Sequence, residues 1–309
     1  FKQKTAYEML RSLVGSEMCI RDRGAHGVSA EIPEGPAWPA PAKLNLFLHV
    51  VGRRADGYHL LQTVFRFLDH GDRLYLVRRT DGAIRLRTPL PGVPAERDLT
   101  WRAARALQVH TGCRLGADIW LDKRLPLGGG LGGGSSDAAT VLIALNRIWG
   151  LGLDRQTLQT LGLALGADVP VFVFGRSAFA EGVGERLQPI ELAPASYVVL
   201  VPPVQVSTAE VFASPALTRN TPTIKIMPLP PGYGRNDLEP VVVTHHPIVG
   251  EYLAWLRQHG DARMTGSGAC VFAAYPDRAT AEAVFGMRPA DWTGFVADGL
   301  DRHPLFAYV

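Results

Sequence analysis

Aliphatic residues recur at every second position near the start of the folded part of the chain. Leucine or valine stands at 44, 46, 48 and 50, and these residues alternate with Lys43, Asn45, Phe47 and His49. A period of two is typical of a β-strand with two different faces. The pattern therefore predicts a strand on which Lys43 and Asn45 point to the same side.

The same reading places further elements in the first half. Strands are expected at 60–68, 72–79 and 83–88, separated by turns at "DHGD" and "TDG", followed by a helix at 99–110 and a strand at 117–125. Beyond a glycine-rich stretch, apolar residues at helical spacing predict a helix that Ser135 or Ser136 caps and Gly150 ends. A second helix is expected from the cap Asp154 to Gly166.

The second half predicts a smaller mixed unit. Strands are expected at 197–201, 269–274 and 294–297, helices at 247–258 and 279–285, and a long surface loop in the proline-rich stretch 214–237. Because glycine and proline cluster at 181–194, a domain boundary is placed there. The chain is therefore expected to be an α+β protein with domains at 31–185 and 186–309, preceded by a lead-in at 1–30.

Charge and composition narrow the possible functions. The formal net charge of the 309 residues is +3, and residues 1–23 contain five basic and three acidic residues, so the rest is almost neutral. This balance argues against nucleic-acid binding, and no apolar run approaches the roughly 18 residues of a membrane span. Residues 1–23 resemble translated sequencing-adapter sequence and are expected to lie outside the natural fold.

The cysteines predict no redox or metal chemistry. Cys19, Cys113 and Cys270 are far apart in the sequence, which gives neither a disulfide framework nor a metal knuckle and is consistent with a reducing cytoplasm. Cys270 stands without a neighbouring histidine, so a buried, small apolar role is expected.

The stretch "LPLGGGLGGGSSDAAT" carries the clearest chemical signal. It has six glycines among the seven residues 128–134 and runs directly into a predicted helix. Ordering so many glycines is entropically costly, and a helix N-terminus offers free N–H groups and a positive dipole end, so an anionic phosphate is the expected ligand. The lysine of a Walker loop is missing after Gly134. A dinucleotide fold is disfavoured because Asp154, at about the right distance, opens a helix and ends no strand.

The loop resembles the phosphate loop of the GHMP kinases, P-x-G-x-G-L-G-S/G-S-S. Its residues here are Pro126, Leu127, Gly128, Gly129, Gly130, Leu131, Gly132, Gly133, Gly134, Ser135 and Ser136. Further family signatures follow in order as "PAKLNLFLHVVGRRADGYHLLQTVF", "GADVPVFVFG" and "TGSGACVF". The resemblance implies the two-domain GHMP fold, with a ferredoxin-like second domain.

The resemblance also implies which residues act. Asp168 corresponds to the catalytic base and Lys43 to the lysine beside it, which would stabilise negative charge on the carboxylate and on the acceptor oxygen. The substrate contacts that it implies are Asn45, Tyr58, His59, Thr208 and Phe212. ATP would bind with Mg²⁺, whose ligands the sequence does not identify, with Ser136 as one candidate. Relatives commonly have asparagine where this chain has Asp98, so no adenine contact is assigned to Asp98.

The "GYH" motif points, by the same resemblance, to a substrate that carries cytosine. The implied reaction moves the γ-phosphate of ATP to the 2-hydroxyl of 4-diphosphocytidyl-2-C-methyl-D-erythritol, in non-mevalonate isoprenoid synthesis, by a cytoplasmic monomer or homodimer without nucleic-acid or membrane partners. The alternatives are a homoserine or mevalonate kinase and a metabolite sensor without catalysis.

Overall fold

A computed structural model describes residues 32–225 and 232–309. The predicted lead-in at 1–30, including residues 1–23 that are expected to be foreign to the fold, lies outside this range. In the described residues the structure is α+β, with no helix long and apolar enough to cross a membrane.

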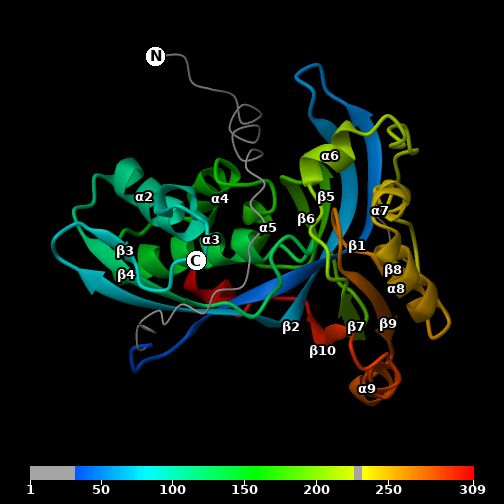
Figure 1. Ribbon diagram of the computed structural model, residues 1–309. Coiled ribbons are helices and arrows are strands. Elements are labelled where there is room, and N and C mark those ends of the chain that lie inside the picture. Colours follow the sequence, from blue (N-terminus) through cyan, green and yellow to red (C-terminus); the bar gives the residue numbers. More distant parts are fainter. Residues whose placement is uncertain (1–31, 226–231) are drawn as a thin grey trace.

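Two long antiparallel strands run through the molecule (Figure 1). They are β1, Trp38–Arg53, and β2, His59–Arg79. The predicted turn at "DHGD" is wrong, because β2 continues through it. Gly71 pairs there with Pro41, and a Cβ on Gly71 would lie 2.2 Å from the Ala40 carbonyl oxygen. Gly71 thus allows a close crossing of the two strands, and Asp72 forms a buried ion pair with Lys123.

The other strands join β2 in one continuous sheet. Its main order is β3-β4-β2-β10-β7-β9-β8, with β1 paired to β2 and the β5–β6 hairpin also joined to β2. The bounds of these strands are β3 Ile84–Leu86, β4 Gly116–Asp122, β5 Ala178–Gly182, β6 Arg186–Pro189, β7 Ser196–Val201, β8 Ala262–Met264, β9 Val271–Tyr275 and β10 Thr293–Leu300. Strand β2 thus connects the two halves of the chain.

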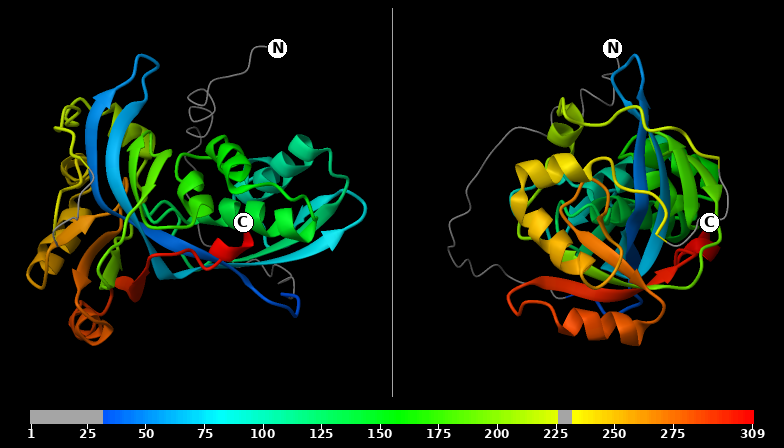
Figure 2. Two further views of the ribbon diagram at one scale, coloured as in Figure 1. Left: turned by 180° about the vertical axis from the view of Figure 1, so that it is seen from behind. Right: turned by 90° about the vertical axis from the view of Figure 1, so that its right-hand side faces the viewer.

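Helices of the first half cover one face of the sheet, as Figures 1 and 2 show. They are η1 Ala95–Arg97, α2 Leu99–Thr111, α3 Gly133–Ile148, α4 Arg155–Leu163 and α5 Val169–Phe174. The prediction that Ser135 or Ser136 caps α3 is wrong. The helix begins at Gly133, and the residue at its N-cap position, Gly132, has no side chain that could accept from the first-turn amides. The cap at Asp154 is confirmed, because its carboxylate accepts from the Thr157 amide.

In the residues described, the second half adds four helices to β7–β10. They are α6 Thr208–Ala213, α7 Glu239–His245, α8 Pro247–Arg257 and α9 Arg278–Gly286, and η2 Phe306–Tyr308 ends the chain. The predicted strands and helices of this half are confirmed, and α6, α7 and β8 are additions. A core of this half also takes in Leu48 and Val50 from β1. The domain boundary near residue 185 remains a prediction.

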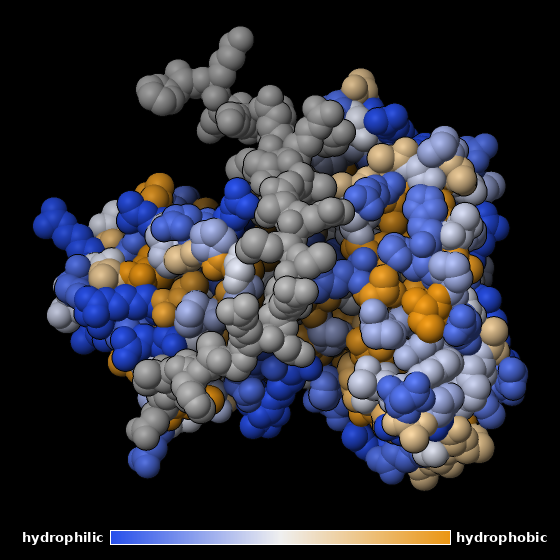
Figure 3. Space-filling view, viewed as in Figure 1, coloured by the Kyte–Doolittle hydropathy of each residue, from blue (hydrophilic) through white to orange (hydrophobic). Residues whose placement is uncertain are grey.

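Hydrophilic residues cover much of the described surface at the outer ends of both halves in Figure 3, and apolar residues form separate patches there.

Candidate active site

The glycine loop lies between the two halves and ends at the N-terminus of α3. Gly128, Gly130 and Gly132 have φ angles of +70°, +77° and +72°, which side-chain-bearing residues rarely adopt. Because no side chain caps α3, the N–H groups of its first turn are left for a ligand. This observation fits a phosphate group, since backbone donors and the positive end of the helix dipole coincide there.

Backbone contacts fix the loop from two sides. The Lys43 amide donates to the Leu131 carbonyl over 2.9 Å, and the Cys270 amide donates to the Gly129 carbonyl over 3.1 Å. A Cβ on Gly130 would lie 2.2 Å from the Thr265 carbonyl oxygen. The "TGSGAC" segment therefore supports the loop from the second half of the chain.

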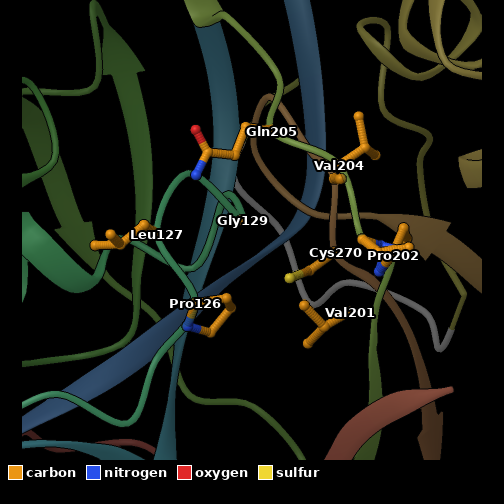
Figure 4. Close-up of a pocket in the computed structure, with 10 residues that line it drawn as sticks. Pro126, Leu127, Gly129, Val201, Pro202, Val204, Gln205 and Cys270 are labelled. Atoms are coloured by element: carbon orange, nitrogen blue, oxygen red, sulfur yellow. The ribbon is translucent and has the colours of Figure 1, made fainter. Parts of the chain in front are cut away.

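A cavity of about 280 Å³ borders the loop (Figure 4). Pro126, Leu127 and Gly129 line it on one side, and residues 201–205 with Cys270 line it on the other. Burial raises the pKa of the Cys270 thiol to about 12, so this side chain is a protonated, small apolar group as predicted. Gln205 contributes a polar side chain to the lining.

The Lys43 ammonium joins the glycine loop to Asp168. This lysine is buried, and its Nζ lies 3.0 Å from the Gly130 carbonyl oxygen, 2.5 Å from Asn45 Oδ1 and 3.1 Å from Asp168 Oδ2. An ammonium has three protons, so these acceptors account for all of them. The predicted catalytic pair is therefore in contact and held against the loop.

Asp168 stands at the N-cap position of α5 but makes no capping hydrogen bond. Its side chain is 36% exposed, whereas that of Lys43 is 2% exposed. A helix-end aspartate with a purely structural role would accept from the first-turn amides. The carboxylate instead remains accessible and is fixed by Lys43.

Asn45 lies next to Lys43 on β1. It is buried, its Oδ1 accepts from Lys43, and its Nδ2 donates to Thr63 Oγ1 over 2.9 Å. The amide oxygen and one of the two N–H donors are thus bonded to protein groups. This geometry lets Asn45 orient Lys43, and its contact with the substrate stays a prediction.

Two of the predicted base-binding residues, His59 and Phe212, also meet. The rings of His59 and Phe212 are stacked, with centroids 4.9 Å apart and planes inclined by 28°. Tyr58 directly precedes His59 in the β1–β2 hairpin. Thr208 and Ser267 share a hydrogen bond of 2.6 Å, which connects α6 to the "TGSGAC" segment and so to the glycine loop. These contacts make one continuous site from the hairpin to the loop.

A buried ionic cluster beneath the loop was not predicted. The Lys123 ammonium donates to Asp72 Oδ2 and, over 2.9 Å, to Asp137 Oδ2. Asp72 Oδ1 accepts from the backbone amides of Arg124 and Leu125. A Cβ on Gly133 would be 2.9 Å from Lys123 Nζ. Burial raises the pKa of Asp137 to about 8, opposed by Lys123. Asp72 in "DHGD" and Asp137 in "SSDA" were the available signal, but only the fold brings them together.

Two other residues are occupied within the protein. Asp98 is the N-cap of α2, and its Oδ1 accepts from the Thr100 amide over 2.8 Å. The Ser136 hydroxyl is buried and donates to the Pro41 carbonyl over 2.7 Å. The described residues contain no cluster of three metal-ligating side chains. The contacts of Ser136 thus give no support for its candidacy as a metal ligand.

Comparisons with known proteins agree with this site. The family model for the N-terminal domain of the GHMP kinases matches residues 98–176, and that for their C-terminal domain matches residues 227–291. A 4-diphosphocytidyl-2-C-methyl-D-erythritol kinase from Thiobacillus denitrificans is 63% identical over 273 residues, which are 88% of this chain and 98% of that protein. The chain belongs to the GHMP kinases.

Further relatives point to the same branch of this family. A kinase of the same name from Dechloromonas aromatica is 61% identical over 87% of this chain and 98% of that protein. A crystal structure of a 4-(cytidine 5'-diphospho)-2C-methyl-D-erythritol kinase, 34% identical, superposes with a TM-score of 0.72 over 85% of this chain and 99% of its own. The expected GHMP fold is confirmed.

Proposed function

We propose that the protein transfers the γ-phosphate of ATP to the 2-hydroxyl of 4-diphosphocytidyl-2-C-methyl-D-erythritol, a step of non-mevalonate isoprenoid precursor synthesis. The observation that carries the proposal is the contact of the Lys43 ammonium with both the glycine loop and the accessible Asp168 carboxylate. Phosphate-binding backbone and a base are thereby held side by side. The high identity to kinases of this name supports the choice of substrate.

Asp168 is the proposed general base. A carboxylate oxygen takes the proton of the acceptor hydroxyl while the hydroxyl oxygen forms its bond to the γ-phosphorus and the bond to the ADP oxygen breaks. Such a base typically contributes about 10²–10⁴-fold to the rate. Lys43 fixes one oxygen of the carboxylate and places positive charge next to the reacting oxygen. Asn45 keeps the ammonium in place.

The glycine loop is the proposed site for the ATP phosphates. Its backbone donors and the first turn of α3 hold the phosphates without a catalytic side chain from the loop. Mg²⁺ bound with the nucleotide would offset phosphate charge.

The other half of the site is proposed to bind the cytidine end of the substrate. Tyr58, His59 and Phe212 supply flat rings for a pyrimidine base, and His59 can also form hydrogen bonds with its edge. Thr208 is a further proposed contact, positioned by Ser267. We also propose that the enzyme works in the cytoplasm, where thiols stay reduced, because Cys113 and Cys270 form no disulfide among the described residues. A monomer or homodimer is the proposed oligomeric state.

The variant Asp168→Asn tests the mechanism. We expect kcat for phosphorylation of the cytidine diphosphate substrate to fall by about 10²–10⁴-fold, because the amide cannot take the proton. The affinity for ATP should change little, since the loop binds the phosphates through its backbone. Coupled measurement of ADP release gives kcat, and calorimetric titration gives the affinity.

Asp154→Asn is the matched control, because Asp154 is also an N-cap aspartate and asparagine caps equally well. It should retain full activity. Near-normal turnover of Asp168→Asn would contradict the assignment of the base. Mevalonate and homoserine serve as competing acceptors in the same assay, and faster turnover of either would contradict the proposed substrate.

A further inference from the structure

Arg219 forms an unusual set of contacts behind the base-binding rings. Its guanidinium donates to three backbone carbonyls, those of Phe212, Ser214 and Leu217, over 3.0, 2.7 and 3.1 Å. Its Nε donates to Nε2 of His59 over 3.1 Å. One side chain thus fixes both the backbone of Phe212 and the ring that Phe212 stacks on.

This contact decides which nitrogen of His59 carries the proton. Arginine has only donors, so the Nε2 that accepts from it must be unprotonated. A neutral imidazole with a free Nε2 carries its hydrogen on Nδ1. Among the described residues, the hydrogen bond of the His59 ring is the one that its Nε2 accepts from Arg219.

The surroundings also keep the ring neutral. Burial, followed by the charges of Arg219 and Arg53, lowers the pKa of His59 to about 4. The stacked Phe212 ring restrains the plane of the imidazole. The ring is therefore a neutral group with a fixed Nδ1–H donor, and this holds at neutral pH.

We propose that Arg219 is a positioning residue that fixes the Nδ1–H tautomer of His59 and thereby makes the site select cytosine over uracil. The proposal rests on the proposed function. The two bases differ at N3, which is an acceptor in cytosine and carries a hydrogen in uracil. The fixed Nδ1–H of His59 can donate to N3 of cytosine, whereas in uracil it would face another N–H donor. A ring free to change tautomer would accept either base.

The tautomer is tested directly, without substrate. Long-range ¹H–¹⁵N correlation spectra of the full-length protein with ¹⁵N-labelled histidine distinguish a protonated Nδ1 from a protonated Nε2, and His59→Gln identifies the signals by their loss. We expect the Nδ1–H form at neutral pH. Spectra that show the Nε2–H form, or an equal mixture of both, would overturn the proposal.

Base selection is tested by calorimetric titration with CDP and UDP. The wild type should bind CDP more tightly, and Arg219→Met should reduce the ratio of the two affinities by about tenfold, the value of one hydrogen bond at the upper end of its range. Arg219→Lys, which keeps a donor, should restore part of the ratio. KM for ATP should not change, since Arg219 lies outside the phosphate loop.

Arg288→Met is the matched control, because Arg288 also bonds backbone carbonyls, those of Phe285 and Trp292, but outside this site. It should leave the ratio unchanged. If Arg219→Met weakens CDP and UDP by the same factor, the residue is only structural and the selection proposal fails. A wild type that binds neither nucleotide contradicts the proposed function and base selection together, whereas the spectra still decide the tautomer. If Arg219→Met does not fold, the wild-type spectra and Arg219→Lys decide the outcome.

Discussion

Alanine variants of Gly130 and Gly128 allow us to measure how much the contact with the "TGSGAC" segment stabilises the glycine loop. Both glycines have φ near +70° to +77°, so alanine at either position meets the left-handed penalty of about 1–2 kcal/mol. At Gly128 the nearest atom to an added Cβ is 3.9 Å away, which is ordinary contact. At Gly130 the Thr265 carbonyl oxygen is 2.2 Å away, so the loop and the "TGSGAC" segment must separate.

Gly130→Ala should therefore cost more than Gly128→Ala. Crowding in a packed region adds about 1–3 kcal/mol, so the free energy of unfolding should fall by about 2–5 kcal/mol for Gly130→Ala and by about 1–2 kcal/mol for Gly128→Ala. Urea unfolding of both variants gives these values. Because the Gly130 carbonyl accepts from Lys43, kcat should also fall more in Gly130→Ala.

Equal losses of stability in the two variants would refute this reasoning. They would mean that the loop moves away from Thr265 without cost, and that the contact with the second half of the chain contributes nothing to its conformation.

Two further predictions concern buried aspartates. Burial raises the pKa of Asp137 in the folded state to about 8, against 3.8 for an ordinary aspartate. Between these pH values the folded state binds a proton that the unfolded state has lost. The free energy of unfolding therefore falls as the pH rises, by at most about 1.4 kcal/mol per pH unit. The free energy of unfolding of Asp137→Asn should lack this pH dependence, so relative to the wild type it should rise between about pH 6 and pH 8 in urea unfolding. If the free energies of both proteins fall in parallel over this range, the prediction is contradicted. Asp98→Ala should lower the free energy of unfolding by about 0.5–2 kcal/mol through loss of the α2 cap, and Asp98→Asn should restore it in the same measurement.

Local patterns predicted most of the elements. Alternation of leucine and valine placed β1, and the Asp154 cap placed the start of α4, because both depend on neighbours in the sequence. "DHGD" was misread because its residues have the composition of a turn. What keeps them in a strand is the close crossing of Gly71 with β1 and the ion pair of Asp72 with Lys123, both long-range contacts.

The same limit applies to the site. Lys43 and Asp168 came from the family resemblance and meet in the structure, although 125 positions separate them. The sequence gives no such signal for Arg219, which lies in a proline-rich stretch that predicts only a surface loop. Its role depends on which ring nitrogen it reaches, and that is set by the packing of the loop on the β1–β2 hairpin.

Strand β2 has a mechanical consequence for the enzyme. It pairs with β1, β4 and β5 and also with β10, which belongs to the second half. Because the two halves are joined through one sheet, they cannot separate as rigid bodies without breaking the hydrogen bonds between β2 and β10. The site should therefore open and close during turnover by movement of short segments at its rim, such as the β1–β2 hairpin and α6. The distance between the Lys43 side chain and the phosphate loop should stay constant.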